Sequence, residues 1–587
     1  MNLFFESKRG NLKHLPTIAI VGQASACAEL QLRRYYPVNA LKFILAATLL
    51  TTLATAADDL PAERVGVSAI ETKLTLADAV ELALKNNLDI EIERTNPALN
   101  RLAIKGALGV FDPTLHYAPG FENRKTPTSS SLQGINGLLA ERAFTQNASV
   151  RWKTPFEGSS VGLDFNNNRQ TTNSPFAGLT PFYNSQLVLS YLQPLWRNRL
   201  IDRDRNEIRI RRKNLDISEL DFKVRVIDVV TRVEQAYWDL VAARQDVTVT
   251  HDAVDLASEQ YNRNQRMIDS GSLAPVELSA SRAELERRRD AYFASLGTVT
   301  EIENNLKSLL TPNRSATLWS EQVIPLDLKS PAPPPTADVK DAVTQAIAQR
   351  PELKQLILRQ ESNAYDQQFA ADQTKPKIDF QANYVNSGLA GAVNTAPNPF
   401  AASLNPLFDR LNQLSAAAGL PPIPTGSSTG LPSSVIGGYG TALGSVFGGN
   451  YQTVSVGLSI DFTLHNRAAQ AQEAQSAITG KRLKLEQSRF EQAVEAQVRN
   501  ALQAIQTARQ RISAAETSEA AAKEKLDSET RLFQTGESTN FLVLTRQNEY
   551  LDARRRTVVA RLESNRATAR LEQALGATLS TYHIDLR

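Results

Sequence analysis

Two stretches of this sequence are copies of one another: Leu76-Ala-Asp-Ala-Val-Glu-Leu-Ala-Leu-Lys-Asn-Asn87 and Val339-Lys-Asp-Ala-Val-Thr-Gln-Ala-Ile-Ala-Gln-Arg350. The second begins 263 positions after the first. In both, apolar residues recur after three and four positions, which is typical of one face of a helix. The pair therefore predicts the same amphipathic helix at two places in the chain.

The same spacing recurs further along the chain. Pro113-Thr-Leu-His-Tyr117 matches Pro376-Lys-Ile-Asp-Phe380, again 263 positions apart. Residues 233–310 align without a gap with residues 498–575, at a spacing of 265. Agreement at several separate places with nearly one offset indicates that the chain is two copies of one unit.

Each unit has the same order of segments, which sets the expected domain boundaries. An amphipathic helix comes first, at 74–106 and 337–372, then an extended, turn-rich segment, then a long helical hairpin. The first repeat covers 57–330, with its β segment at 111–196 and its hairpin at 203–311. The second covers 337–576, with its β segment at 376–465 and its hairpin at 466–576. A Pro-rich linker at 331–336 joins them, and 577–587 is a tail.

The hairpins carry a coiled-coil-like pattern. In the second copy, residues at alternating spacings of four and three are apolar: Val494, Val498, Ala501, Ile505, Ala508, Ile512 and Ala515. The first copy shows the same seam: Val229, Val233, Ala236, Leu240, Ala243, Val247 and Thr250. This 3.5-residue period indicates packed helices. No Pro occurs from Asp204 to Gly271, so a helix of ~100 Å is expected there at about 1.5 Å per residue.

The β segments alternate between apolar and polar residues. Examples are Asn147–Lys153, Ser160–Asn166, Gln186–Pro194 and Thr453–Phe462. Period 2 over about ten residues, with aromatic residues near the ends, is typical of transmembrane β-strands and also of a soluble sandwich. A Gly/Ala/Pro/Ser-rich stretch at 388–449 predicts a long loop between two strands, as in the external loops of membrane barrels.

Composition argues against several classes of protein. A net charge of +3 gives no bulk basic character for binding nucleic acid. Five His, one Cys and two Met leave little material for a metal site or a thiol nucleophile. The chain has no phosphate-binding loop, no G-x-S-x-G and no H-E-x-x-H. We therefore expect no enzyme and no cofactor.

The N-terminus predicts export. Lys42, an apolar run at 43–53 and Ala54-Thr-Ala56 have the order of a signal peptide, with cleavage after Ala56. The alternative is a lipoprotein signal that ends at Cys27. Beyond residue 56 no apolar run reaches ~18 residues, so no transmembrane helix is expected.

Six short motifs follow one another along the duplicated chain: Leu74–Asn87, Phe111-Asp-Pro113, Gln193-Pro-Leu195, Ala236-Tyr-Trp-Asp-Leu240, Arg350-Pro-Glu-Leu353 and Phe533-Gln-Thr-Gly-Glu-Ser-Thr-Asn540. Taken in this order, they resemble the TolC-type outer-membrane efflux family over about 74–576. The resemblance implies a mainly helical chain with β-strands, and a homotrimer in the outer membrane of a Gram-negative cell. Three chains would pool strands into a transmembrane β-barrel, and their hairpins would form a periplasmic α-barrel. A periplasmic adaptor and an inner-membrane pump would be its partners.

By the same resemblance, the hairpin tips are the expected functional residues. The residues expected to dock the adaptor are Gly271, Ser272, Leu273, Ala274, Pro275, Gly536, Glu537, Ser538 and Thr539. The residues expected at a pore constriction are Glu277, Ser538, Asn540 and Thr545. Glycine permits the sharp reversal and Pro275 suits the restart of a helix, so these residues also read as a simple turn.

The sequence departs from the family in two respects. Leu542, Thr545 and Ser538 stand where the family's gate carries carboxylates and an Arg, and only Glu277 is acidic, which puts ion-pair gating in doubt. The family also has four strands per subunit. The first repeat adds a candidate hairpin at 147–168, which is either two further strands or an ordered external loop.

The main alternative function is a periplasmic coiled-coil adaptor or scaffold. It would explain the helical hairpins but not the duplicated aromatic strand segments.

Overall fold

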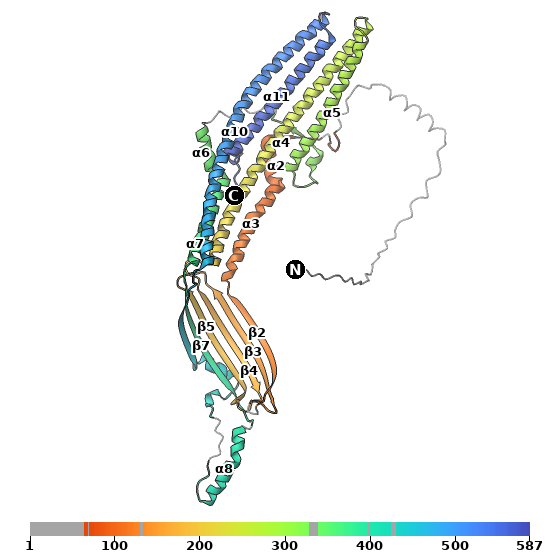
Figure 1. Cartoon of the computed structure of the whole chain (residues 1–587). Coiled ribbons are helices and arrows are strands. Elements are labelled where there is room, and N and C mark those ends of the chain that lie inside the picture. Colours follow the sequence, from red (N-terminus) through yellow and green to blue (C-terminus); the bar gives the residue numbers. More distant parts are fainter. Residues whose placement is uncertain are drawn as a thin grey trace, which may run out of the picture. The chain divides into compact units, whose positions relative to one another are not determined.

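The computed structural model describes residues 64–68, 70–129, 133–327, 338–396, 399–423 and 430–586. Arg64–Arg587 forms one compact unit, so the two repeats do not separate into independent bodies. The expected signal segment at 1–56, Cys27 and the linker at 331–336 lie outside the described residues. In Figure 1 the long helices of both repeats run side by side, with a β-sheet at one end of them.

The two repeats contain similar elements in the same order. The first has β1 (Glu71–Leu74), α2 (Leu76–Asn86), α3 (Leu88–Leu108), β2 (Thr114–Pro127), β3 (Leu138–Lys153), β4 (Ser160–Thr172), β5 (Leu179–Pro194), α4 (Arg203–Asp269), α5 (Val276–Leu310) and β6 (Gln322–Pro325). The second has α6 (Val339–Gln349), α7 (Pro351–Gln373), β7 (Lys377–Val393), α8 (Pro399–Ala417), α9 (Tyr439–Phe447), β8 (Gln452–Asp461), α10 (Arg467–Gln534) and α11 (Asn540–Leu575), followed by α12 (Thr578–Thr581).

Each predicted N-terminal helix is two helices. Asn87 ends α2 and caps α3, because its side chain accepts hydrogen bonds from the N–H groups of Asp89 and Ile90. In the second repeat Pro351 is the first residue of α7. A proline disfavours helical backbone at the residue before it, and Arg350 is extended. The breaks at 87 and 350 are therefore equivalent in position but have different chemical causes.

The predicted seams form the helical core. Val229, Val233 and Leu240 are fully buried in the first repeat, as are Val494 and Val498 in the second. With 67 residues, α4 is ~100 Å long at about 1.5 Å per residue. The structure thus confirms long, coiled-coil-like hairpins, α4 with α5 and α10 with α11.

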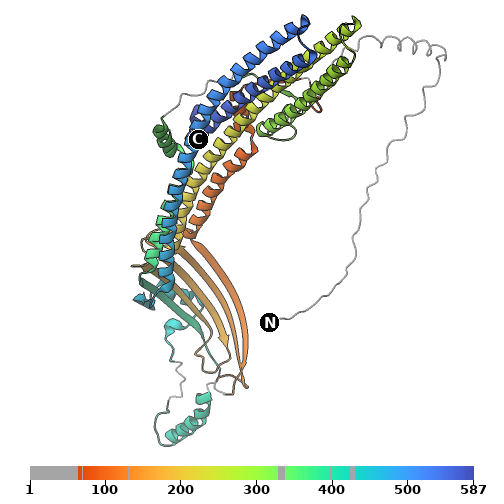
Figure 2. The same ribbon diagram turned by 45° about the horizontal axis from the view of Figure 1, so that its top comes forward.

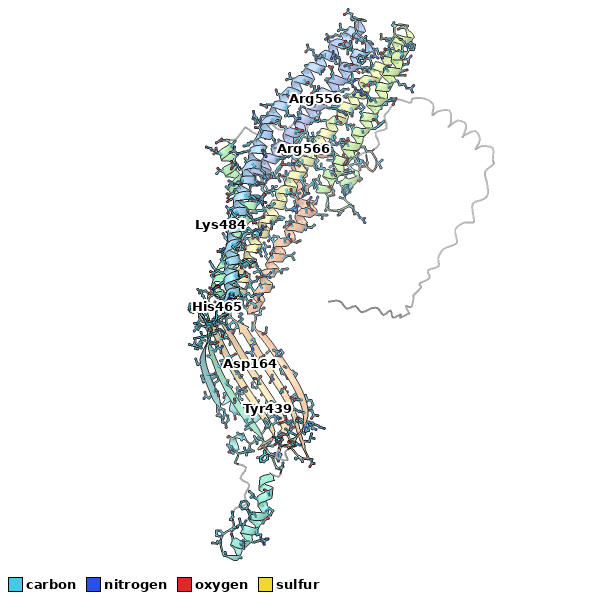
Figure 3. All side chains as sticks on the ribbon, viewed as in Figure 1. Asp164, Tyr439, His465, Lys484, Arg556 and Arg566 are labelled. Atoms are coloured by element: carbon cyan, nitrogen blue, oxygen red, sulfur yellow. The ribbon has the colours of Figure 1, made fainter. Side chains whose placement is uncertain are left out.

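The main sheet has six antiparallel strands in the order β2-β3-β4-β5-β7-β8, and β1 and β6 form a separate parallel pair. The candidate hairpin at 147–168 belongs to β3 and β4, which pair with each other over Glu141–Lys153 and Ser160–Thr172. The structure therefore gives two further strands rather than an external loop. The turn from β8 into α10 contains His465 at the junction of the sheet with the helices (Figure 3).

The register sorts the side chains of all six strands onto two faces. One, here called the apolar face, carries Leu115, Tyr117, Phe121, Phe144, Val150, Trp152, Val161, Leu163, Phe165, Leu187, Leu189, Tyr191, Ile378, Phe380, Tyr384, Val454, Val456, Leu458 and Ile460. The other, the polar face, carries His116, Glu122, Thr145, Asn147, Arg151, Asp164, Asn166, Gln186, Asn383, Ser455 and Ser459, among others.

The connection between β7 and β8 differs from the predicted loop at 388–449. β7 continues to Val393, and the connection contains α8 and α9. α9 packs on the apolar face: Phe447 lies 6.3 Å from Phe165 and Tyr439 lies 5.9 Å from Tyr183, measured between ring centroids. A side chain at Gly388 would collide with the carbonyl of Ala442, so glycine permits this close approach.

Candidate functional site

The tips of the two helical hairpins lie at the end of the helices away from the sheet (Figure 2). Both are built in the same way. After α4, the N–H of Gly271 donates to the carbonyl of Ile268 (2.8 Å) and the N–H of Ser272 to that of Met267 (2.8 Å). After α10, Gly536 and Glu537 repeat these two bonds (3.2 and 2.9 Å). This is the Schellman ending, which requires a left-handed residue, and φ is 74° at Gly271 and 80° at Gly536.

The tip residues predicted from the sequence are mostly exposed. In the first tip Gly271, Ser272, Ala274 and Pro275 are exposed and Leu273 is half-buried; in the second Gly536, Glu537 and Thr539 are exposed and Ser538 is half-buried. Two apolar residues that the sequence analysis did not single out join them. Val276 (71% exposed) and Phe541 (72% exposed) begin the returning helices at positions that the duplication makes equivalent. The first tip thus presents Val276 to solvent, and the second presents Phe541 together with Leu542 (37% exposed).

A buried polar network links the two hairpins just behind the tips. Asn540, at the start of α11, is 3% exposed. Its Oδ1 accepts hydrogen bonds from the side chains of Gln260 (3.0 Å) and Asn264 (3.2 Å) on α4. Its Nδ2 donates to Oε2 of Glu277 on α5 (3.0 Å). One side chain of the second repeat therefore connects both helices of the first repeat.

The partners of Asn540 are held in place by further contacts. Asn264 is fully buried and donates to Oγ of Ser281 (3.2 Å) on α5, and Gln260 donates to Oδ1 of Asn264 (2.9 Å). Continuing the four-and-three spacing of the α4 seam beyond Thr250 reaches Asn264. A polar residue in an otherwise apolar seam was the signal in the sequence that would have located this network.

Of the other predicted constriction residues, Glu277 joins this network, and Ser538 and Thr545 do not. Glu277 is half-buried and its carboxylate belongs to the Asn540 network. Ser538 donates instead to Glu529 on α10, which also lies 3.8 Å from Arg546. The Thr545 hydroxyl donates to the carbonyl of Phe541 within α11 (2.8 Å). The structure brings together Glu277 and Asn540, while Ser538 and Thr545 make other contacts.

A buried carboxyl group lies in the middle of the helical region. Glu234 on α4 is 2% exposed and hydrogen-bonds Tyr582, just after α12. The pKa of Glu234 is raised to about 7, chiefly by burial and to a smaller extent by nearby Glu572, while the hydrogen bond from Tyr582 opposes the rise. Burial also raises the pKa of Tyr582. Burial thus favours the protonated form of Glu234, whereas the hydrogen bond from Tyr582 favours its carboxylate.

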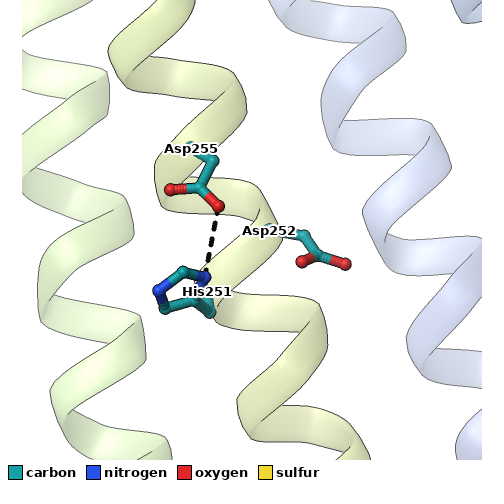
Figure 4. A group of neighbouring side chains, drawn as sticks. All are labelled: His251, Asp252 and Asp255. Carbon is teal, nitrogen blue, oxygen red and sulfur yellow. Dashed lines mark ion pairs between the residues drawn. The ribbon is translucent and has the colours of Figure 1, made fainter. Parts of the chain in front are cut away.

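One group among the described residues has the composition of a metal site: His251, Asp252 and Asp255 on α4. Figure 4 shows that Nδ1 of His251 faces Asp255, with 3.2 Å between the paired atoms, while Asp252 points toward the neighbouring hairpin. Asp252 there pairs with Arg554 of α11 (2.6 Å). Asp252 and Asp255 thus already have partners, Arg554 and His251, and the group is best described as polar contacts on the side of α4 that is not buried in the core.

No described helix is both long enough and apolar enough to cross a membrane.

Comparison with known proteins supports the resemblance. The family model of the outer membrane efflux proteins matches residues 160–311 and 342–577. A search of curated protein sequences finds no match.

Solved structures share the fold. The Campylobacter jejuni CmeC outer membrane channel is 15% identical, with 86% of each chain covered and a TM-score of 0.57. CusC is 16% identical, with 85% of this chain and 91% of that chain covered and a TM-score of 0.56. The open state of the Neisseria gonorrhoeae MtrE channel is 14% identical, with 86% and 89% covered and a TM-score of 0.55.

Proposed function

Since this chain belongs to the outer membrane efflux protein family, we propose that three copies form a passive exit duct in the outer membrane. An inner-membrane pump and a periplasmic adaptor deliver the substrate, and the chain itself carries out no chemistry. The duct consists of the sheet, which lies in the membrane, and the helical hairpins, which extend into the periplasm.

The observation that carries this proposal is the apolar face of the sheet. Val454, Val456, Leu458 and Ile460 on β8 are each 63–67% exposed. On a water-soluble protein such a contiguous patch is a liability, whereas a barrel in lipid needs an apolar outer wall. Trp152 and Tyr191 lie on this face near the helical end of the strands, where aromatic residues mark the interface of a membrane barrel.

The hairpin tips are proposed to dock the adaptor. The exposed tip residues surround large apolar side chains, Val276 on one tip and Phe541 with Leu542 on the other. Apolar anchors inside a polar rim are the usual arrangement of a protein interface. Because the two tips are equivalent by duplication, one trimer offers six similar docking points to repeated adaptor subunits.

The Asn540 network is proposed to hold the tips of the two hairpins together and thereby to set the width of the periplasmic entrance. The network lies between the two repeats, so separating the tips requires its hydrogen bonds to break. The residue at the centre of the network is a neutral amide, which agrees with the expectation that this chain lacks the ion-pair gate of its family.

Extraction from membranes separates this proposal from the scaffold alternative. We expect the protein to stay with outer membranes in salt and alkali, to require detergent for release, and to run as a trimer. Release by salt alone as a water-soluble species would instead support the periplasmic scaffold.

A further inference from the structure

The hairpin of β3 and β4 is an integral part of the sheet. β3 pairs with β2 from Leu138 to Arg151, and β4 pairs with β5 from Ser160 to Gln170. The two strands therefore lie between their neighbours with a hydrogen-bonded partner on each side. In Figure 1 they follow the same curvature as the rest of the sheet.

The hairpin also carries the same two-faced pattern as the other strands. Val150 and Trp152 of β3 stand opposite Leu163 and Val161 of β4 on the apolar face. On the polar face, Arg151 pairs with Asp164 across the strands (2.7 Å). Side chains with this alternation suit a wall with lipid on one side and water on the other.

The two edges of the sheet are open and suited to each other. Among the described strands, β2 and β8 each pair with one neighbour only, and both are almost entirely exposed. All five strand pairings are antiparallel, so β2 and β8 run in opposite directions. The β8 of one copy can therefore pair with the β2 of the next without breaking the antiparallel pattern.

The residues on these edges favour such pairing. β8 contains no Lys, Arg or Pro, the residues that usually protect an edge strand from association. In β2, residues of this kind begin at Pro119, so Thr114–Ala118, next to the helices, is free of them. The apolar face would continue from Leu458 and Ile460 of one copy to Leu115 and Tyr117 of the next.

We infer that the transmembrane barrel of this protein has eighteen strands, six from each of three copies, and is closed by β8 of one copy against β2 of the next. The inference rests on the proposed trimeric channel and specifies the number of strands in its barrel and the strands that close it. With about 4.8 Å between strands and a tilt of about 40°, eighteen strands give a backbone diameter of ~36 Å, against ~24 Å for twelve. Barrels of this size hold an open aqueous lumen. The helical tunnel and the loops, rather than the barrel, would therefore limit the size of the substrates that pass.

Disulfide cross-linking tests the closure. In a Cys27→Ser background, Tyr117→Cys is combined with Val456→Cys, Leu458→Cys or Ile460→Cys, which allows for a shift of register. All four side chains lie on the apolar face. We expect at least one pair to give covalent trimers after mild oxidation. The matched control is Tyr117→Cys with Ser459→Cys, whose side chain lies on the polar face, and it should give none.

A second pair of variants tests whether the additional hairpin faces lipid. Leu163→Lys places a charge on the apolar face, and Asn166→Lys places the same charge on the polar face of the same strand. We expect Leu163→Lys to lower the yield of membrane trimer at least about tenfold and Asn166→Lys to leave it unchanged.

The outcomes of these experiments distinguish failure of the eighteen-stranded barrel from failure of the proposed channel function. If trimers form but never cross-link, or if they tolerate Leu163→Lys, the eighteen-stranded barrel is refuted, while the proposal that the protein is a trimeric channel stands. Absence of membrane trimers from the unsubstituted protein overturns the channel itself.

Discussion

Replacing Asn540 by Ala should loosen the periplasmic end of the protein. The substitution removes two hydrogen bonds accepted from Gln260 and Asn264 and one donated to Glu277. A hydrogen bond of this kind contributes about 1 kcal/mol, and leaving a buried partner unpaired costs about 1–3 kcal/mol. Gln260 and Asn264 keep their bond to each other, so we expect a total cost of about 2–4 kcal/mol.

That cost is large relative to a gating equilibrium. Each 1.4 kcal/mol changes a population ratio about tenfold, so the separated form of the tips should become roughly 30- to 700-fold more populated. We would measure single-channel conductance in planar bilayers, and the rate of trypsin cleavage at Arg266, Arg282 and Arg531, which flank the tips. The variant should conduct more and be cleaved faster. Thr545→Ala is the control, because its hydroxyl bonds only within its own helix among the contacts seen here.

A pair of charge variants examines the same contact without creating a cavity. Asn540→Asp keeps the acceptor for Gln260 and Asn264 but sets a carboxylate against Glu277. Adding Glu277→Gln restores a donor on the other side, so the double variant should recover most of the loss. If Asn540→Ala and Asn540→Asp both match the unsubstituted protein in conductance and cleavage, the network does not hold the tips together.

Three further predictions concern single residues. Because the pKa of Glu234 rises from 4.5 to about 7, the folded chain binds a proton that the unfolded chain has lost between these values. The free energy of unfolding should therefore fall by about 3 kcal/mol as pH rises from 4.5 to 7. Melting curves should show this contribution, and Glu234→Gln should make the fall smaller by about that amount; an equal fall in the variant contradicts the assignment. Gly271→Ala and Gly536→Ala should each destabilise a tip by about 1 kcal/mol through positive φ alone, since the added methyl meets no atom within 4 Å. Gly297→Ala, in the interior of α5 with the same free space, should instead stabilise slightly, and equal effects on tip cleavage in all three would refute the backbone argument. Glu277→Gln should weaken the cation preference of the channel if three Glu277 carboxylates line the entrance, and an unchanged ion preference measured in a salt gradient would limit Glu277 to its bond with Asn540.

The sequence allowed the helical architecture to be predicted because its signals are periodic and long. The seam from Val229 to Thr250 repeats in the second copy, and a duplicated 3.5-residue pattern has few other interpretations. The breaks at Asn87 and Arg350 were missed, since neither a capping Asn87 nor Pro351 after Arg350 alters the apolar spacing around it.

The sheet and the site were harder to predict. Whether 147–168 formed strands or a loop depended on partners distant in the sequence, such as Gln186 opposite Asn166, and local alternation does not specify them. α9 was missed because a helix of nine residues in a Gly-rich stretch has almost no periodic signal. Asn540 was predicted from the resemblance, but its partners Gln260 and Asn264 lie 280 and 276 positions away and became visible only in the folded chain.

Single-channel recording of the detergent-extracted trimer in planar bilayers tests the central claim most directly. The account predicts that the unsubstituted protein forms a water-filled pore with a stable single-channel conductance, and that Asn540→Ala has a larger conductance. A folded, helical protein that forms no trimer and passes no current would contradict the channel and leave the periplasmic scaffold as the better description.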